Sequence, residues 1–136
     1  SWQNNFINSR LKPLEEGKSM KDISIKAVTN IISSNKNQKI ITFASNIMAS
    51  ISINTYKSAI LSLIGFDVRD KLINIATPIL LISGDEDKQA PAKTMESMSK
   101  KIKNSKYLEI KNCGHLIHLE KPEIFNRSIK EFILNL

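Results

Sequence analysis

A short apolar segment followed at once by three acidic residues constrains this chain more than any other feature of its sequence. Residues 79–82 (ILLI) lack the polar alternation of a strand with one face in water. Such a run is typical of a parallel strand buried on both faces, and Pro78 opens it, where a missing N–H costs least. Gly84 and the acidic residues 85–87 (DED) then end the run. Carboxylates therefore follow the carboxyl end of a strand, where open α/β sheets place their sites.

A second strand is predicted to follow through a helix. Met95, Met98 and Ile102 have helical spacing after Pro91, and the apolar residues within 107–110 predict a strand. A strand, a crossover helix and a second strand form a right-handed unit, so both strands end at the same edge of the sheet. The loop after the second strand should therefore emerge beside the acidic turn.

That loop carries a histidine, His115, in the sequence Asn-Cys-Gly-His. An acid and a base can therefore meet at the edge of the predicted sheet. A carboxylate bonded to Nδ1 holds a histidine in the tautomer that a general base requires. The order of acid and then histidine is also that of the last two members of the α/β-hydrolase triad.

Two motifs in this region resemble the C-terminal end of an α/β-hydrolase. Residues 84–87 match Gly-x-x-Asp after an apolar strand, and residues 114–122 match Gly-His-x-x-x-x-Glu-x-Pro. Residues 66–72 resemble the return of the chain from a cap domain into the sheet. The similarity is strong over residues 67–136, and among capped members it is closest to esterases and 3-oxoadipate enol-lactonases. It implies the α/β class and a partial α/β-hydrolase fold, with a helical cap followed by a C-terminal βαβα unit of a parallel sheet.

The resemblance implies that Asp87 is the acid and His115 the base of a catalytic triad. Asp85 and Glu86 are alternatives for the acid. In such an enzyme the histidine takes a proton from a serine and later activates water, while the acid orients the ring. The expected substrate is a small-molecule ester, lactone or related carbonyl compound, and the family implies no cofactor and no metal.

The nucleophile of this family is missing from the sequence. It lies in a Gly-x-Ser-x-Gly turn, and none of the glycines at positions 17, 65, 84 and 114 flanks a serine in that way. We therefore expect a C-terminal fragment of a serine hydrolase that is inactive on its own. A two-stranded parallel sheet is poorly stable, so the expected partner is the missing N-terminal half or a second copy of the chain.

Two other functions are compatible with the missing nucleophile. The chain could be a non-catalytic hydrolase remnant that acts as an interaction module, or part of an enzyme with an aspartate nucleophile. Cys113 could replace the serine beside His115, although a small buried thiol is the commoner role of a lone cysteine. Cys113, His115 and His118 could bind zinc, but a zinc site needs a fourth group and a preorganised geometry.

The first half of the chain predicts four amphipathic helices. Gly17 and Gly65 are typical helix stops, and Ser19 with Asp22 resembles a capping box. Trp2 is expected on a buried face. The predicted helices cover about residues 1–16, 20–32, 40–51 and 54–64. The resemblance assigns residues 1–74 to a cap and residues 75–136 to the hydrolase core, although a generic helical subdomain has the same periodicity.

Charge and composition restrict the partners. The net charge is +7, but the basic residues are almost all scattered lysines without interleaved aromatic residues, so no nucleic-acid partner is expected. No apolar run approaches the length of a membrane span, and no signal segment is present, so we expect no membrane partner and a cytoplasmic location. Apolar residues at every third or fourth position after Pro122 predict a closing helix.

Overall fold

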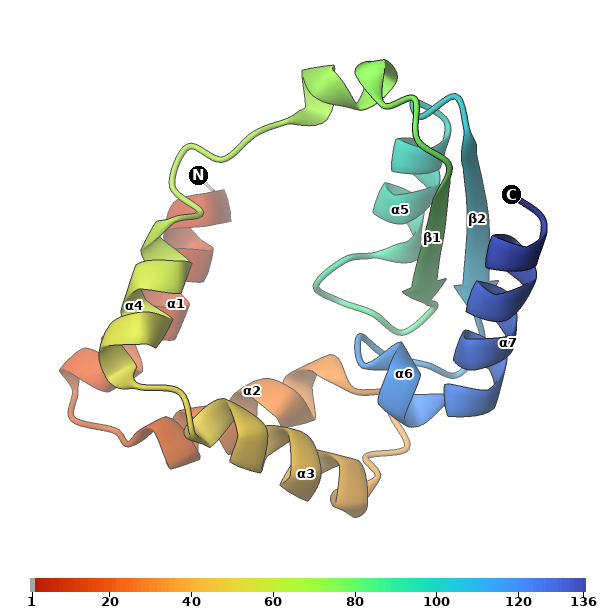
Figure 1. The fold of residues 1–136 in the computed structure, drawn as a ribbon. Helices are drawn as coiled ribbons and strands as arrows, with labels where there is room; N and C mark the ends of the chain where they lie inside the picture. Colours follow the sequence, from red (N-terminus) through yellow and green to blue (C-terminus); the bar gives the residue numbers. More distant parts are fainter. Residues whose placement is uncertain (1) are drawn as a thin grey trace. The chain divides into compact units, whose positions relative to one another are not determined.

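The computed structural model describes residues 2–136, with side chains from Asn4 onwards, so the prediction for the Trp2 side chain lies outside the described residues. Helices and strands follow one another as shown in Figure 1: α1 (Trp2–Glu15), α2 (Met20–Ile31), α3 (Gln38–Ala49), α4 (Ile53–Leu61), the 3-10 helix η1 (Arg69–Asn74), β1 (Ile79–Gly84), α5 (Ala92–Ser99), β2 (Ser105–Ile110), α6 (Ile117–Glu120) and α7 (Pro122–Leu134). None of the helices in the described part of the chain is long and apolar enough to cross a membrane.

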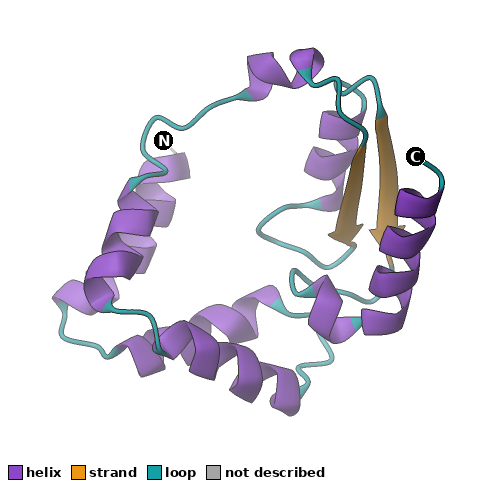
Figure 2. Ribbon diagram, viewed as in Figure 1, coloured by secondary structure: helices purple, strands orange, loops and turns teal. Residues whose placement is uncertain are grey.

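The chain forms two compact units. The first, here called the helical unit, comprises Ser1–Asn30 and Asn37–Asp67, and the second, the sheet unit, comprises Ile31–Lys36 and Val68–Leu136. Both strands, drawn in orange in Figure 2, belong to the second unit by their residue ranges. The stretch between the predicted fourth helix and the first strand is not all loop, because it contains η1.

Local hydrogen bonds set the limits of the helices in the helical unit. Gly17 has φ +84°, the conformation of a glycine helix stop. The predicted capping box is confirmed: the Asp22 N–H donates to Ser19 Oγ at 3.2 Å, and the Ser19 N–H donates to Asp22 Oδ2 at 3.3 Å. Asn37 and Ser52 accept hydrogen bonds at the starts of α3 and α4. The four predicted helices are therefore present.

The core of the helical unit is centred on α2. Its buried apolar side chains are Ile7, Met20, Ile23, Ala27, Val28, Ile41 and Tyr56. The apolar stripes predicted for the next two helices are only partly buried, because Ile47 is 55% and Ile64 is 60% exposed. No helix of this unit covers these side chains, so their burial requires a surface from outside it.

The sheet unit contains the predicted strand-helix-strand arrangement. β1 pairs with β2 in parallel, with Ile79 opposite Ser105 and Gly84 opposite Ile110. α5 connects the two strands and packs on both, whereas α7 lies on the other side of the sheet (Figure 1). Pro122 is the first residue of α7, as the sequence predicts.

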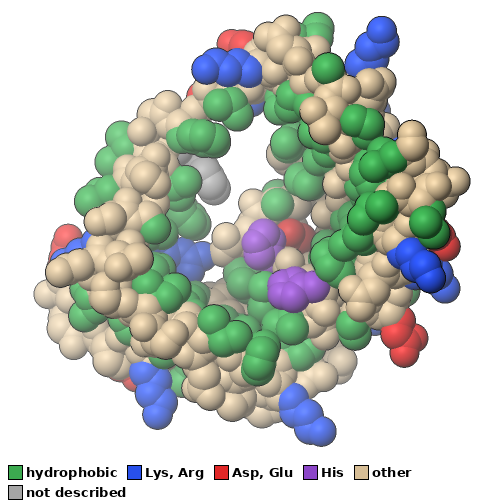
Figure 3. Space-filling model, in the orientation of Figure 1, with side chains coloured by type: hydrophobic (Ala, Val, Ile, Leu, Met, Phe, Trp, Pro, Cys, Tyr) green, Lys and Arg blue, Asp and Glu red, His purple; other side chains and the backbone are tan. Residues whose placement is uncertain are grey.

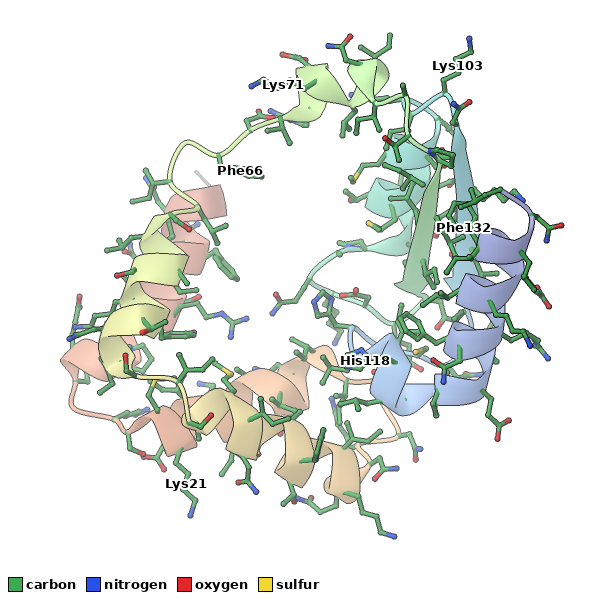
Figure 4. The ribbon with its side chains drawn as sticks, viewed as in Figure 1. Lys21, Phe66, Lys71, Lys103, His118 and Phe132 are labelled. Carbon is green, nitrogen blue, oxygen red and sulfur yellow. The ribbon has the colours of Figure 1, made fainter. Side chains whose placement is uncertain are left out.

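Alternate side chains of the strands form two small cores. The first contains buried Leu72, Leu81 and Ile102, with methionines of α5 packed against them. The second contains Ile110, Cys113 and Ile117 under Phe125 of α7. Figure 4 shows Phe132 where α7 runs beside β2, and the Lys106 ammonium lies 5.9 Å from its ring centroid.

The first strand is less buried than its sequence predicts. Leu81 is 6% exposed, but Ile79, Leu80 and Ile82 are only half-buried. In the described part of the chain β1 has a single neighbouring strand, so its other edge offers unpaired backbone groups. The predicted strand is therefore present, but its side chains are not all buried as expected for a strand covered on both faces.

Candidate active site

The turn after β1 holds a buried carboxylate in a fixed position. The Asp87 N–H donates to the carbonyl of Gly84 at 3.3 Å, which closes the turn. Asp87 Oδ1 accepts hydrogen bonds from the backbone N–H groups of Gln89 at 2.8 Å and Ala90 at 3.0 Å. Its side chain is only 4% exposed. One oxygen is therefore committed to the backbone, and the other, Oδ2, remains for a partner.

That partner is His115, whose Nδ1 lies 2.8 Å from Asp87 Oδ2. An ionised carboxylate can only accept hydrogen bonds, so the contact requires the proton on Nδ1. In the neutral ring this leaves Nε2 as an acceptor. The His115 side chain is 40% exposed, in contrast to Asp87. The structure thus brings together the two side chains that the sequence selects.

The neighbouring acids have other partners. Asp85 Oδ1 accepts from the Cys113 N–H at 3.3 Å, and its Oδ2 lies 3.8 Å from the Lys111 ammonium. Glu86 accepts from the N–H of Ser34 at 2.6 Å and from its hydroxyl at 3.2 Å. Neither of these acids pairs with the histidine, so Asp87 alone of the three can orient it.

Close approach of neighbouring backbone explains why the two motifs have glycine at positions 84 and 114. A Cβ on Gly84 would lie 2.1 Å from the carbonyl oxygen of Cys113, and a Cβ on Gly114 would lie 2.5 Å from that of Ile31. Both neighbours are backbone atoms that cannot rotate away. The missing side chains allow the acidic turn, the histidine loop and the segment Ile31–Lys36 to lie in contact.

Glu120 also contributes to this arrangement, and the sequence prediction did not select it. Its Oε1 accepts from the Gly114 N–H at 3.1 Å, and its Oε2 accepts from the Ser33 N–H at 2.8 Å. The His115 N–H donates to the Ile31 carbonyl at 2.7 Å. Hydrogen bonds therefore join the histidine loop to the segment Ile31–Lys36, more than 80 positions away in the sequence. The available signal was the glutamate of the Gly-His-x-x-x-x-Glu motif, whose partner no spacing rule reveals.

The remaining candidates lie elsewhere or are chemically unsuited. Cys113 is fully buried, and burial raises the pKa of its thiol to about 11, so it stays protonated near neutral pH. His118 lies on α6 (Figure 4), with its ring 6.0 Å from that of Phe125. Among the described side chains, no group of three His, Cys, Asp or Glu residues could hold a metal ion.

The arrangement can accept a proton at Nε2 of a histidine whose side chain is 40% exposed. Both histidines are exposed, and Figure 3 shows them (purple) with an acidic side chain (red) beside one. The buried carboxylate fixes the ring of His115 and stabilises the imidazolium that forms when Nε2 takes a proton. No described hydroxyl or thiol is hydrogen-bonded to this nitrogen.

The sequence matches the alpha/beta hydrolase fold family over residues 5–122. It is 34% identical over 68 residues to a pimeloyl-[acyl-carrier protein] methyl ester esterase of Legionella pneumophila, a match that covers 50% of this chain and 28% of that protein. The matched part is thus a minor share of the relative's length.

Solved structures resemble most of the chain. An esterase from Thermogutta terrifontis has a TM-score of 0.84 at 22% identity, covering 98% of this chain and 50% of that one. The enol-lactonase from Burkholderia xenovorans LB400 has a TM-score of 0.81 at 18% identity, covering 92% and 48%. This chain therefore spans about half the length of these proteins. The predicted fold class is confirmed, and the chain belongs to the alpha/beta hydrolase fold family.

Proposed function

We propose that this chain supplies the acid and the base of a serine hydrolase that acts on ester, lactone or related carbonyl substrates. The observation that carries the proposal is the contact of 2.8 Å between His115 Nδ1 and Asp87 Oδ2. In this mechanism Nε2 of His115 takes the proton of an attacking serine and returns it to the leaving group. It then activates the water that releases the acyl product, while Asp87 orients the ring.

The serine, in this proposal, comes from a segment outside residues 1–136. The four glycines form no Gly-x-Ser-x-Gly turn, and the chain spans about half of the solved hydrolases that it resembles. The unpaired edge of β1 and its half-buried isoleucines would be covered by such a segment. Residues 1–136 alone are then expected to be inactive.

The two parts of the chain would have different roles in the complete enzyme. Residues 1–74 would form the cap, which excludes water from the reaction and shapes the substrate pocket. Residues 75–136 would complete the catalytic sheet. The proposed mechanism requires no metal and no cofactor.

The test is hydrolysis of p-nitrophenyl butyrate by the natural product of the reading frame that encodes these residues. We expect hydrolysis by that product and a loss of at least about a thousandfold in kcat for His115→Ala. The control is His118→Ala, which removes the other histidine, on α6, and should retain activity. Equal activity of the wild type and His115→Ala would refute the proposal.

A non-catalytic interaction module is the second candidate, favoured by the exposed apolar side chains of α3 and α4. Phe43 is 56% and Ile47 is 55% exposed, and these side chains would suit an interface with another protein or with a second copy. This candidate predicts no esterase activity for the natural product and no effect of either histidine variant on its association state.

A further inference from the structure

A cavity of about 450 Å³ lies within the helical unit, lined by α1, α2 and the turn between them. Cavities that bind small molecules have volumes of roughly 300–1,000 Å³, so this one is large enough for a ligand. None of its lining residues belongs to the acid and histidine site.

The base of the cavity is apolar. Ile23 is 7% and Ala27 is 6% exposed, and both project from α2. The ring of Phe6 from α1 is half-buried beside them. A hydrocarbon chain or an aromatic ring would be removed from water against this surface, which contributes about 25 cal/mol for each Å² buried.

The border of the cavity is basic. Arg10, Lys18 and Lys26 line it, and none of the three forms an ion pair in the part of the chain that the structure describes. The single carboxylate there, Asp22, is engaged with Ser19, whose hydroxyl donates to it at 2.6 Å. Three cations against one carboxylate leave a positive field over an apolar base.

Arg10 is the best placed of the three cations for a ligand. Its Cζ lies 5.1 Å from the centroid of the Phe6 ring, and this contact holds the guanidinium over the apolar base. A guanidinium presents a planar pair of donors that matches a carboxylate. Figure 3 shows basic side chains (blue) next to hydrophobic ones (green) in the part formed by α1 and α2.

We propose that this cavity binds small organic acids, with the carboxylate at Arg10 and the hydrocarbon part against Phe6, Ile23 and Ala27. Both features are needed for this ligand class. Inorganic anions would gain nothing from the apolar base, and neutral apolar molecules would gain nothing from the three cations. The inference is independent of the proposed hydrolase function.

The experiment is an NMR titration of the protein with sodium octanoate, followed through the backbone amides of α1 and α2. We expect saturable shifts confined to these helices, weaker binding in high salt, and little binding of octanamide, which has the same chain without the charge. Arg10→Gln should weaken octanoate binding by roughly tenfold or more. Lys21→Gln is the matched control, because Lys21 is on α2, lies outside the cavity lining and points away from the helix in Figure 4.

Several results would overturn the proposal. These are the absence of saturable octanoate shifts, equal binding of octanamide and octanoate, or equal losses of octanoate affinity in Arg10→Gln and Lys21→Gln. Displacement of octanoate by an equal concentration of inorganic phosphate would identify a plain anion site instead. If the circular dichroism spectrum of Arg10→Gln shows a loss of helix, Lys26→Gln replaces it, with the same expected direction. Hydrolysis is not measured, so failure here would leave the hydrolase proposal unaffected.

Discussion

Glu120 is predicted to hold the histidine loop in place, and Glu120→Ala is the variant that tests this. The substitution removes both oxygens that accept the N–H groups of Gly114 at 3.1 Å and Ser33 at 2.8 Å. Hydrogen bonds to a charged group contribute about 1.5–3 kcal/mol each, so two of them set a ceiling of about 3–6 kcal/mol. Glu120 is half-buried, so water can partly replace the two hydrogen bonds in the variant. We therefore expect the free energy of unfolding to fall by about 2–3 kcal/mol.

Amide hydrogen exchange followed by NMR measures this effect at the two groups concerned. In Glu120→Ala the amides of Ser33 and Gly114 should lose protection, and the His115 N–H, which donates to the Ile31 carbonyl at 2.7 Å, should exchange faster as well. Glu120→Gln keeps one acceptor and should give an intermediate result. Glu131→Ala, an exposed glutamate of α7, is the control. If the Ser33 amide keeps the same protection in Glu120→Ala and Glu131→Ala, Glu120 does not hold the loop.

Three further predictions concern Gly84, Cys113 and Asp87 of the sheet unit. Gly84→Ala should lower the free energy of unfolding by about 1–3 kcal/mol, because its Cβ would lie 2.1 Å from the Cys113 carbonyl oxygen. The control is Gly65→Asn, whose side chain meets open space and should change the free energy of unfolding by less than about 0.5 kcal/mol. Equal denaturation midpoints for the two variants would refute the steric role of Gly84. Burial raises the pKa of Cys113 from 9.0 to about 11, so the stabilisation from keeping the thiol protonated is complete below pH 9 and is lost as the pH rises through 11. This linkage amounts to about 2–3 kcal/mol, and Cys113→Ala should abolish that part of the pH dependence in urea titrations. In the complete enzyme Asp87→Asn should lower kcat by roughly 10³–10⁴-fold through the wrong histidine tautomer, and a KM effect without a kcat effect would contradict the assigned role.

Local patterns were sufficient to predict the elements around the site. The apolar run of residues 79–82 and the spacing of Met95 and Met98 predict a strand and its crossover helix, because hydrophobic pattern and periodicity are local properties. Asp87 and His115 then meet because a right-handed crossover brings both strand ends to one edge of the sheet. The glycines were selected as motif members. Their physical reason is visible only in three dimensions: a Cβ on Gly84 or Gly114 would lie 2.1 Å or 2.5 Å from a backbone oxygen.

Long-range contacts could not be predicted. The hydrogen bond from Ser33 to Glu120 joins positions 87 residues apart, and no periodicity marks such a pair. The exposure of Ile47 and Ile64 could not be predicted for a related reason, since a helical stripe shows that a face is apolar but not what covers it. The cavity between α1 and α2 likewise depends on how two helices pack.

In the proposed enzyme, Asp87 and His115 serve a serine carried outside residues 1–136. The most direct measurement is mass spectrometry of the natural product after reaction with a fluorophosphonate ester, which labels an activated serine. We predict one adduct, on a serine outside these residues within a Gly-x-Ser-x-Gly turn, formed in the wild type and in His118→Ala but abolished in His115→Ala. An adduct on a serine within residues 1–136, an adduct unaffected by His115→Ala, or no adduct at all would contradict the proposed pairing of this histidine with an external serine.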